Sequence, residues 1–199
     1  MDVLKRFQQA VDGSLSVRRG AELHISDLVH TCPRKIYTNI ISRKNPKPLE
    51  WGTKLRFWIG NAIHEPPILK HHHLKLVWEG IHAEVDEYED GIVLEKKHTT
   101  YLSDRLPKHY ERQGEYYKAM LVKCGYPVEE VHVLLIDIVA PDAKDFLVQT
   151  RAVDEIAKEI LFKRDLLNYS LKFCLFPAAI RGDDCKYCGH AEACESENL

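Results

Sequence analysis

Long apolar runs are missing from this 199-residue chain, in which no stretch of about 18 consecutive apolar residues occurs. The first seven residues, MDVLKRF, lack the apolar segment that a secretory leader carries. Internal repeats and low-complexity linkers are missing as well. These absences argue against a helical membrane span and a repeat array. We expect a cytoplasmic protein without a membrane partner.

A strong excess of one charge is also missing, because 28 Lys and Arg face 30 Asp and Glu, for a formal net charge of −2. This balance excludes a uniformly basic nucleic-acid-binding protein. The charges are nevertheless divided along the chain: residues 1–75 hold 13 Lys and Arg against 6 Asp and Glu, and residues 76–199 hold 15 against 24. A basic part of the chain can attract phosphate while an acidic part binds metal. The alternative is that the charges only cover solvated faces of the protein.

The chain does contain enough apolar material for one folded domain, because 45% of its residues are hydrophobic. An Asp90-Gly91 pair within the alternating segment 74–101 predicts two antiparallel strands joined by a two-residue turn. The apolar run 131–139 predicts a buried strand, and the three histidines at 71–73 are expected at a solvated helix end. The predicted fold class is therefore α/β. Helices are predicted over residues 2–11, 26–37, 49–64, 109–124 and 150–171, the last with Thr150 as its N-cap.

The predicted hairpin places two carboxylates opposite each other. Its turn puts Asp86 opposite Glu95 and Glu84 opposite Lys97, all on one face. Directly opposed like charges destabilise a sheet, and a Mg²⁺ or Mn²⁺ ion between Asp86 and Glu95 would convert that repulsion into a binding site. Lys97 could then orient a water nucleophile or stabilise charge on a phosphate. The alternative is a solvent-facing hairpin with a Glu84–Lys97 ion pair and no metal.

Asp86, followed by Glu95-Lys96-Lys97 on the next strand, resembles the core motif of the PD-(D/E)XK nucleases. Two flanking motifs resemble those of the RecB-like branch of that superfamily. The segment GNAIH at 60–64 resembles its G-x-x-x-H segment, and QGEYY at 113–117 resembles its Q-x-x-x-Y motif. The resemblance implies a mixed central sheet flanked by helices. It implies metal ligation by His64, Asp86, Glu95 and the backbone carbonyl of Lys96, catalysis assisted by Lys97, and positioning of the DNA strand by Gln113 and Tyr117.

Lys96 departs from the family pattern, in which the residue between the Glu and the Lys is usually apolar and faces the core. We expect its aliphatic stem to pack while its amine reaches water. A rival hypothesis takes Lys96 as the sign of a decayed site in a non-catalytic DNA-binding or scaffold protein.

The six cysteines favour metal binding over disulfides in a chain expected in the cytoplasm. Cys185, Cys188 and Cys194 lie close together in the sequence, and Cys32 is a distant fourth thiolate. These residues suit zinc as well as an iron–sulfur cluster, and His190 could complete a Cys3His zinc site without Cys32. A structural zinc protein with no nucleic-acid role is thus a third hypothesis. The two other cysteines, Cys124 and Cys174, are expected to be structural thiols.

The segment CPRKIY at 32–37 resembles the C-P-R-x-x-Y segment of the iron–sulfur nucleases, which have one cysteine before the nuclease core and three after it. Over residues 26–194 the chain is similar to the CRISPR-associated RecB-like exonucleases. The resemblance implies a 4Fe-4S cluster on Cys32, Cys185, Cys188 and Cys194. It also implies an exonuclease, or endonuclease, on single-stranded DNA that trims DNA for spacer acquisition with the CRISPR integrase complex and forms a homo-oligomer. Relatives in viruses and mobile elements use the same core in other settings.

Three segments are expected: a helical segment 1–48 that contributes one cluster cysteine, a nuclease core 49–172, and a cysteine segment 173–199. Basic residues in the first 56 positions are candidates for salt-dependent phosphate contacts. These candidates are Arg34, Lys35, Arg43, Lys44, Lys54 and Arg56.

Overall fold

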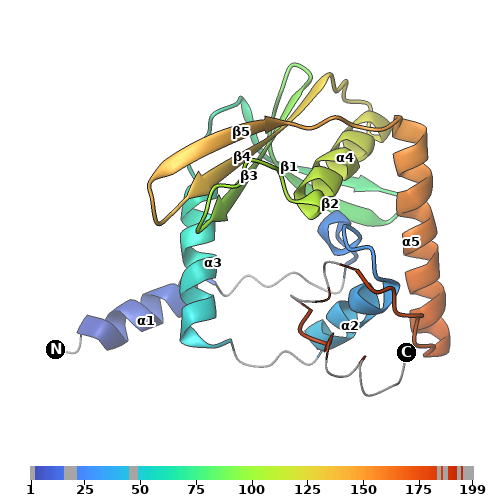
Figure 1. Ribbon diagram of the computed structural model, residues 1–199, viewed down its shortest axis with the longest axis horizontal. Coiled ribbons are helices and arrows are strands. Elements are labelled where there is room, and N and C mark those ends of the chain that lie inside the picture. The colour runs from blue at the N-terminus through green and yellow to red at the C-terminus, as the bar shows by residue number, and fades with distance from the viewer. Residues whose placement is uncertain are drawn as a thin grey trace.

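A computed structural model of the chain describes residues 3–15, 22–44, 49–182, 185, 188–191 and 194, apart from the side chain of Lys44. Its centre is a five-stranded sheet in the order β1-β2-β3-β4-β5 (Figure 1). Strands β3 and β4 pair in parallel, and the other neighbours pair antiparallel. The predicted α/β class is confirmed as a mixed sheet flanked by helices. The strands are β1 His71–Trp78, β2 Ile81–Glu89, β3 Ile92–Thr99, β4 Glu130–Asp137 and β5 Asp142–Leu147.

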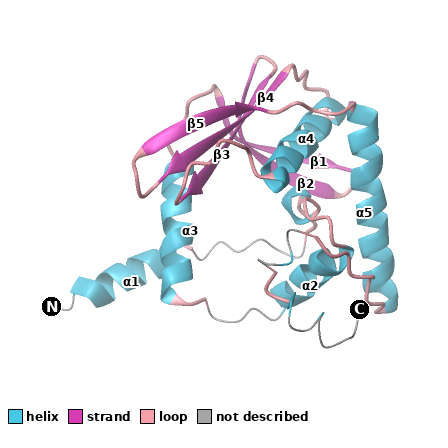
Figure 2. Cartoon of the chain, in the orientation of Figure 1, coloured by secondary structure: helices cyan, strands magenta, loops and turns pink. Residues whose placement is uncertain are grey.

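Helices surround the sheet and extend beneath it (Figure 2). Helix α4 lies across strands β1 to β4, α5 packs on α4 and α2, and α1 packs on α3. The helices are α1 Val3–Ser14, the 3-10 turn η1 Ile25–Asp27, α2 Pro33–Lys44, α3 Trp51–His64, α4 Lys108–Lys123 and α5 Val153–Phe173.

The segment 74–101 forms three strands where two were predicted. The predicted turn at Asp90-Gly91 is confirmed, with φ angles of 43° and 91°. A second tight turn lies at Glu79-Gly80, with φ angles of 51° and 74°. It was missed because Glu is a poor residue at a turn position that needs positive φ. The histidines at 71–73 consequently belong to β1 rather than to a helix end.

Two predicted helix starts also need correction. The chain over 26–37 is not one helix, because η1 ends at Asp27 and α2 begins at Pro33, whose missing N–H suits the first helical position. Helix α5 begins after Ala152, not after Thr150. Thr150 instead accepts a hydrogen bond of 2.9 Å from the Lys118 ammonium. Strand β5 was not predicted because its residues are mostly exposed and half of them are charged, as an edge strand allows.

Helices α3 and α4 lie on opposite sides of β3. From α4, Gln113 contacts Glu95, whereas Gly60 of α3 lies against the ring of His98. Alternate residues of a strand point to opposite faces, so odd-numbered and even-numbered residues of β3 meet different helices. Gly114 lets α4 approach the sheet, since a Cβ atom there would lie 2.9 Å from Cγ1 of Val131.

We expect Gly114→Ala to destabilise the fold by about 1–3 kcal/mol, because Val131 is buried and stiff and cannot move away from the new methyl group. The free energy of urea unfolding measures this effect. Gly52→Ala is the matched control, since Gly52 lies in α3 and a Cβ there meets nothing within 4 Å. That variant should be neutral or slightly more stable, because alanine favours helix. Equal effects at the two positions would contradict the close approach of α4.

A partly buried polar network joins α4 to α5. The Tyr116 hydroxyl donates to Glu159 at 2.6 Å, and Lys163 contacts Glu159 at 2.9 Å and Tyr116 at 2.7 Å. Arg151 reaches the other oxygen of Glu159 at 2.8 Å. Burial alone would raise the pKa of Glu159, but hydrogen bonds from Tyr116, Lys163 and Arg151 lower it from 4.5 to about 2. The network therefore stabilises the fold while Glu159 is ionised.

This lowered pKa predicts a loss of stability in acid. The stabilisation is present above pH 4.5, the ordinary pKa of the group, and disappears as the pH falls toward 2. We expect roughly 1–2 kcal/mol, since the carboxylate is 26% exposed and partly screened. Urea unfolding of wild type and Glu159→Gln between pH 6 and pH 3 should show the difference between them shrinking. Glu155→Gln, an exposed change in the same helix, should show a constant difference.

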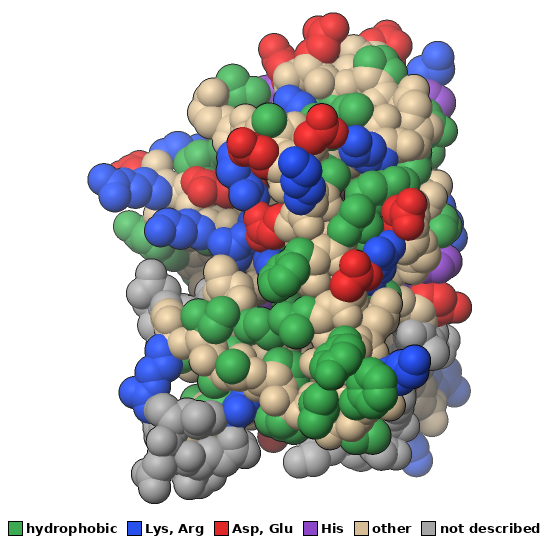
Figure 3. Space-filling view, turned by 90° about the vertical axis from the view of Figure 1, so that its right-hand side faces the viewer, with side chains coloured by type: hydrophobic (Ala, Val, Ile, Leu, Met, Phe, Trp, Pro, Cys, Tyr) green, Lys and Arg blue, Asp and Glu red, His purple; other side chains and the backbone are tan. Residues whose placement is uncertain are grey.

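The outer face of α5 is open to solvent. Figure 3 views this side of the molecule and shows hydrophobic side chains between charged ones. Three aromatic residues of α5 are exposed there: Phe162, Tyr169 and Phe173. Within the described ranges, no helix is long and apolar enough to cross a membrane.

Candidate active site

The two carboxylates of the predicted hairpin lie at the end of the β2–β3 ladder. The predicted register is confirmed for three pairs, from Glu89 opposite Ile92 to Glu87 opposite Leu94. The ladder then stops, one pair before Asp86 and Glu95. Instead of facing Glu95 within a regular ladder, Asp86 accepts a hydrogen bond of 2.8 Å from the backbone N–H of Lys96.

His64, the last residue of α3, lies next to Asp86. Nδ1 of His64 is 2.9 Å from Oδ2 of Asp86. Burial tends to raise the pKa of Asp86, but hydrogen bonding to His64, the charges of His64 and Lys97, and the N–H of Lys96 together lower it. Asp86 is therefore held as a carboxylate, the form that binds a cation.

Glu95 is the most buried acidic group of the site, with an exposed fraction of 1%. Its Oε1 accepts a hydrogen bond of 2.7 Å from Gln113 and pairs with the Lys97 ammonium. Its Oε2 is buried and has no hydrogen-bond partner among the residues that the structure describes. Burial, opposed by Lys97 and reinforced by the negative charge of Asp86, raises the pKa of Glu95 to about 8. The Asp86 carboxyl lies next to this group, and a cation bound between the two would give Oε2 a partner and favour the ionised form of Glu95.

Lys97 and the residues of α4 complete the network. Burial tends to lower the pKa of Lys97, but Glu95 and Asp86 raise it, so the side chain stays charged. Nε2 of Gln113 also lies 2.9 Å from the Tyr117 hydroxyl. The alternative Glu84–Lys97 ion pair is wrong, because Glu84 pairs with His73 at 2.9 Å.

The donor set of this site fits a divalent cation. It combines one imidazole and two carboxylates, a mixture suited to Mn²⁺ or Mg²⁺. In this conformation the side chains contact one another and Lys97, and the described residues contain no preassembled cluster of three or more His, Cys, Asp or Glu side chains. The fit therefore rests on the chemistry of the donors and on the unpaired oxygen of Glu95.

Lys96 does not behave as predicted. Its amine was expected to reach water, but the whole residue is 1% exposed and its ammonium forms an ion pair with buried Glu87. Both faces of β3 are covered at this point, one by α4 and the other by the chain that follows α3. A further residue at this site, His72, was not predicted; its Nε2 lies 2.6 Å from the His64 carbonyl oxygen. Residues 71–73 were predicted to lie at a helix end, so the position of His72 in strand β1 was not recognised.

The candidate phosphate contacts differ in their availability. Arg34 is buried, and its Nε donates to the Pro177 carbonyl at 2.9 Å. The guanidinium of Arg43 is paired with Asp27, and Lys54 pairs with Asp12 at 2.7 Å. The prediction that Arg34 contacts phosphate is therefore replaced by a structural role, in which its buried side chain holds the chain at Pro177. Of the others, Arg56 bonds the Gly52 carbonyl on an exposed surface, Lys35 borders the cysteine cavity, and the Lys44 side chain lies outside the described part.

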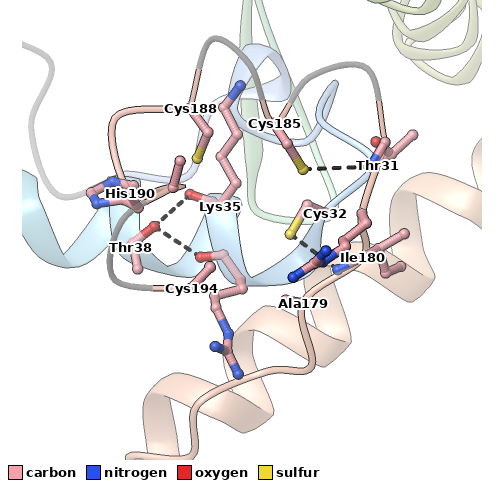
Figure 4. Close-up of a pocket in the computed structure, with 14 residues that line it drawn as sticks. Thr31, Cys32, Lys35, Thr38, Ala179, Ile180, Cys185, Cys188, His190 and Cys194 are labelled. Carbon is pink, nitrogen blue, oxygen red and sulfur yellow. Dashed lines mark hydrogen bonds between the residues drawn. The ribbon is translucent and has the colours of Figure 1, made fainter. Parts of the chain in front are cut away.

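The cysteine segment and the start of α2 enclose a cavity of about 560 Å³ (Figure 4). Ile180 donates its N–H to Sγ of Cys32 at 3.4 Å, and Gly182 donates to Sγ of Cys185 at the same distance. Such N–H···S bonds stabilise metal-bound thiolates. Distant parts of the sequence therefore meet here. The cavity is bordered by Cys32, Cys185, Cys188, Cys194 and His190, so its lining suits either an iron–sulfur cluster or zinc.

Contacts beside this cavity explain the spacing of the C-P-R-x-x-Y segment. Arg34 and Tyr37 lie on one side of α2, and both contact Phe176: the guanidinium lies 4.9 Å from its ring centre, and the Tyr37 ring 5.2 Å. With the hydrogen bond from Arg34 to Pro177, these contacts fix the chain after α5 against α2.

Neither a family model nor a curated protein sequence matches the chain. The fold is similar to a solved structure described as "Crystal structure of SSO0001", with a TM-score of 0.61 and 16% sequence identity. The similarity covers 99% of this chain and 98% of that one. At this identity it shows the fold alone.

Proposed function

We propose that this protein is a metal-dependent DNA nuclease of the RecB-like PD-(D/E)XK type that degrades single-stranded DNA as an exonuclease. One observation carries the proposal. Side chains from α3, β2, β3 and α4 gather at the carboxyl groups of Asp86 and Glu95, and the buried Oε2 of Glu95 has no hydrogen-bond partner in the described part of the chain. These side chains are His64, Asp86, Glu95, Lys97 and Gln113.

Each residue has a separate role in this proposal. His64, Asp86, Glu95 and the backbone carbonyl of Lys96 would hold Mn²⁺ or Mg²⁺, which supplies Lewis-acid polarisation of the phosphate when bound. Lys97 provides a fixed positive charge beside the reacting phosphodiester, where negative charge develops. Gln113 holds one oxygen of Glu95, and Tyr117 holds the Gln113 amide.

We propose further that Cys32, Cys185, Cys188 and Cys194 hold a 4Fe-4S cluster. The cluster would fasten the C-terminal segment to α2, where the N–H···S bonds and the contacts of Phe176 already lie. By its resemblance to the CRISPR-associated exonucleases, the protein would trim DNA for spacer acquisition with the integrase complex. A viral or mobile-element nuclease is the alternative setting.

A nuclease assay on purified protein tests this function. End-labelled single-stranded DNA should be degraded with Mn²⁺ or Mg²⁺ and spared with EDTA, and labels at the 5′ and 3′ ends give the polarity. Binding should weaken as salt increases, because Lys and Arg release counterions from phosphate. Salt-dependent binding without degradation by either metal would support the scaffold hypothesis instead.

A further inference from the structure

The buried ion pair between Lys96 and Glu87 has no part in the proposed chemistry. It lies on the side of β3 away from Gln113, and its side chains are 2% and 0% exposed. Burying two charges costs several kcal/mol each, so a hydrophobic pair at such a position is often at least as stable. The pair therefore calls for an explanation other than stability.

The pair holds the chain that connects α3 to β1. The Lys96 ammonium donates to the carbonyl of Pro66 and lies 3.5 Å from that of His64. Glu87 accepts hydrogen bonds from the backbone N–H groups of Ile68, at 2.7 Å, and of Leu69. These four contacts, at residues 64, 66, 68 and 69, fix the segment to β2 and β3.

Lys96 also touches the partner of His64. Its backbone N–H donates to the same Asp86 oxygen that lies 2.9 Å from the His64 ring. The contacts form a closed circuit, from Lys96 through Asp86 and His64 and back through the His64 and Pro66 carbonyls. His72 adds a second bond to the His64 carbonyl at 2.6 Å. The end of α3 is followed by Glu65-Pro66-Pro67, which cannot continue the helix, so these contacts take over the positioning of His64.

We propose that Lys96 and Glu87 are positioning residues, which hold the end of α3 so that the His64 imidazole stays beside Asp86. The inference rests on the proposed metal-dependent function. It gives Lys96, which departs from the apolar residue usual at this position, a role that an apolar side chain does not have. Only a hydrogen-bond donor can bind the carbonyl oxygens of His64 and Pro66.

The test is the affinity for Mn²⁺, measured by electron paramagnetic resonance without DNA. The main variant is Glu87→Gln with Lys96→Met, which leaves no unpaired buried charge and keeps an acceptor for the Ile68 and Leu69 amides. We expect it to fold and to bind Mn²⁺ about 10–100-fold more weakly, as loss of a group that orients a metal ligand does. In a His64→Ala background the same double change should have no further effect, since Lys96 acts through His64.

Ile160→Ala is the control for a merely structural role. Ile160 is buried in α5, far in sequence from the site, and its truncation should lower stability without changing Mn²⁺ affinity. Wild-type Mn²⁺ affinity in the folded double variant, or an equal further loss in the His64→Ala background, would overturn this inference and leave the nuclease proposal intact. A wild-type protein that binds no Mn²⁺ would overturn both.

Discussion

Lys97→Ala is expected to reduce metal-dependent degradation of single-stranded DNA by roughly 10²–10³-fold or more, the usual cost of removing a group that stabilises transition-state charge. The fold should survive, because Glu95 already has a pKa of about 8 and can take a proton when its cation is removed. DNA binding should be nearly intact, since one of many basic groups is lost. Initial rates on labelled DNA, with binding followed by fluorescence anisotropy, measure the two effects separately.

Lys123→Ala provides the control for this variant. Lys123 also forms an ion pair, with Asp154 at 2.8 Å, but it lies on the exposed end of α4. Its removal should leave the rate unchanged. If Lys97→Ala retained the wild-type rate while EDTA still abolished activity, the phosphodiester would be hydrolysed at another site.

Cys185→Ser is expected to remove the cluster. Four cysteines predict about four irons per chain and visible charge-transfer absorption in anaerobically purified protein. The variant should lose most of both. Because metal binding at a structural site contributes folding free energy, its unfolding temperature should also fall by about 10 °C or more. Iron and zinc analysis, absorption spectra and thermal unfolding give the three results.

The chain contains its own controls for this experiment. Cys174→Ser changes an exposed thiol that follows α5, and Cys124→Ser a thiol near the Val77 carbonyl. Both variants should keep the wild-type iron content. One zinc and no iron per wild-type chain would contradict the cluster, and His190→Ala would then show whether His190 is the fourth zinc ligand.

The predictable part of the fold was local. Asp90-Gly91 adopts the φ angles of a two-residue turn whatever surrounds it, so the register from Glu89 to Glu87 followed from sequence. The end of α3 at His64 followed equally from Pro66, which disfavours helix in the residue before it. The turn at Glu79-Gly80 has a weaker sequence signal, so the division of the first predicted strand into β1 and β2 was missed. Strand β5, mostly exposed and half charged, carried almost no signal.

The candidate site was predictable as a set of residues but not as an arrangement. The motifs selected His64, Asp86, Glu95, Lys97, Gln113 and Tyr117, and the structure brings them into one network. The pairing of Asp86 with the Lys96 amide could not be predicted, because it requires the ladder to end one residue early. Where a ladder ends depends on the chain that packs beside it.

The sequence by itself determined the chemistry that this protein has available: a carboxylate hairpin with a lysine, a histidine at a helix end, and four cysteines in two distant segments. These depend on residue type and on short-range periodicity. Only the tertiary structure decided that Lys96 is buried against Glu87, that Arg34 holds the C-terminal segment, and that Cys32 lines one cavity with the later cysteines. Burial and long-range contact depend on what covers each face of a strand or helix, and here the covering residues come from distant parts of the chain.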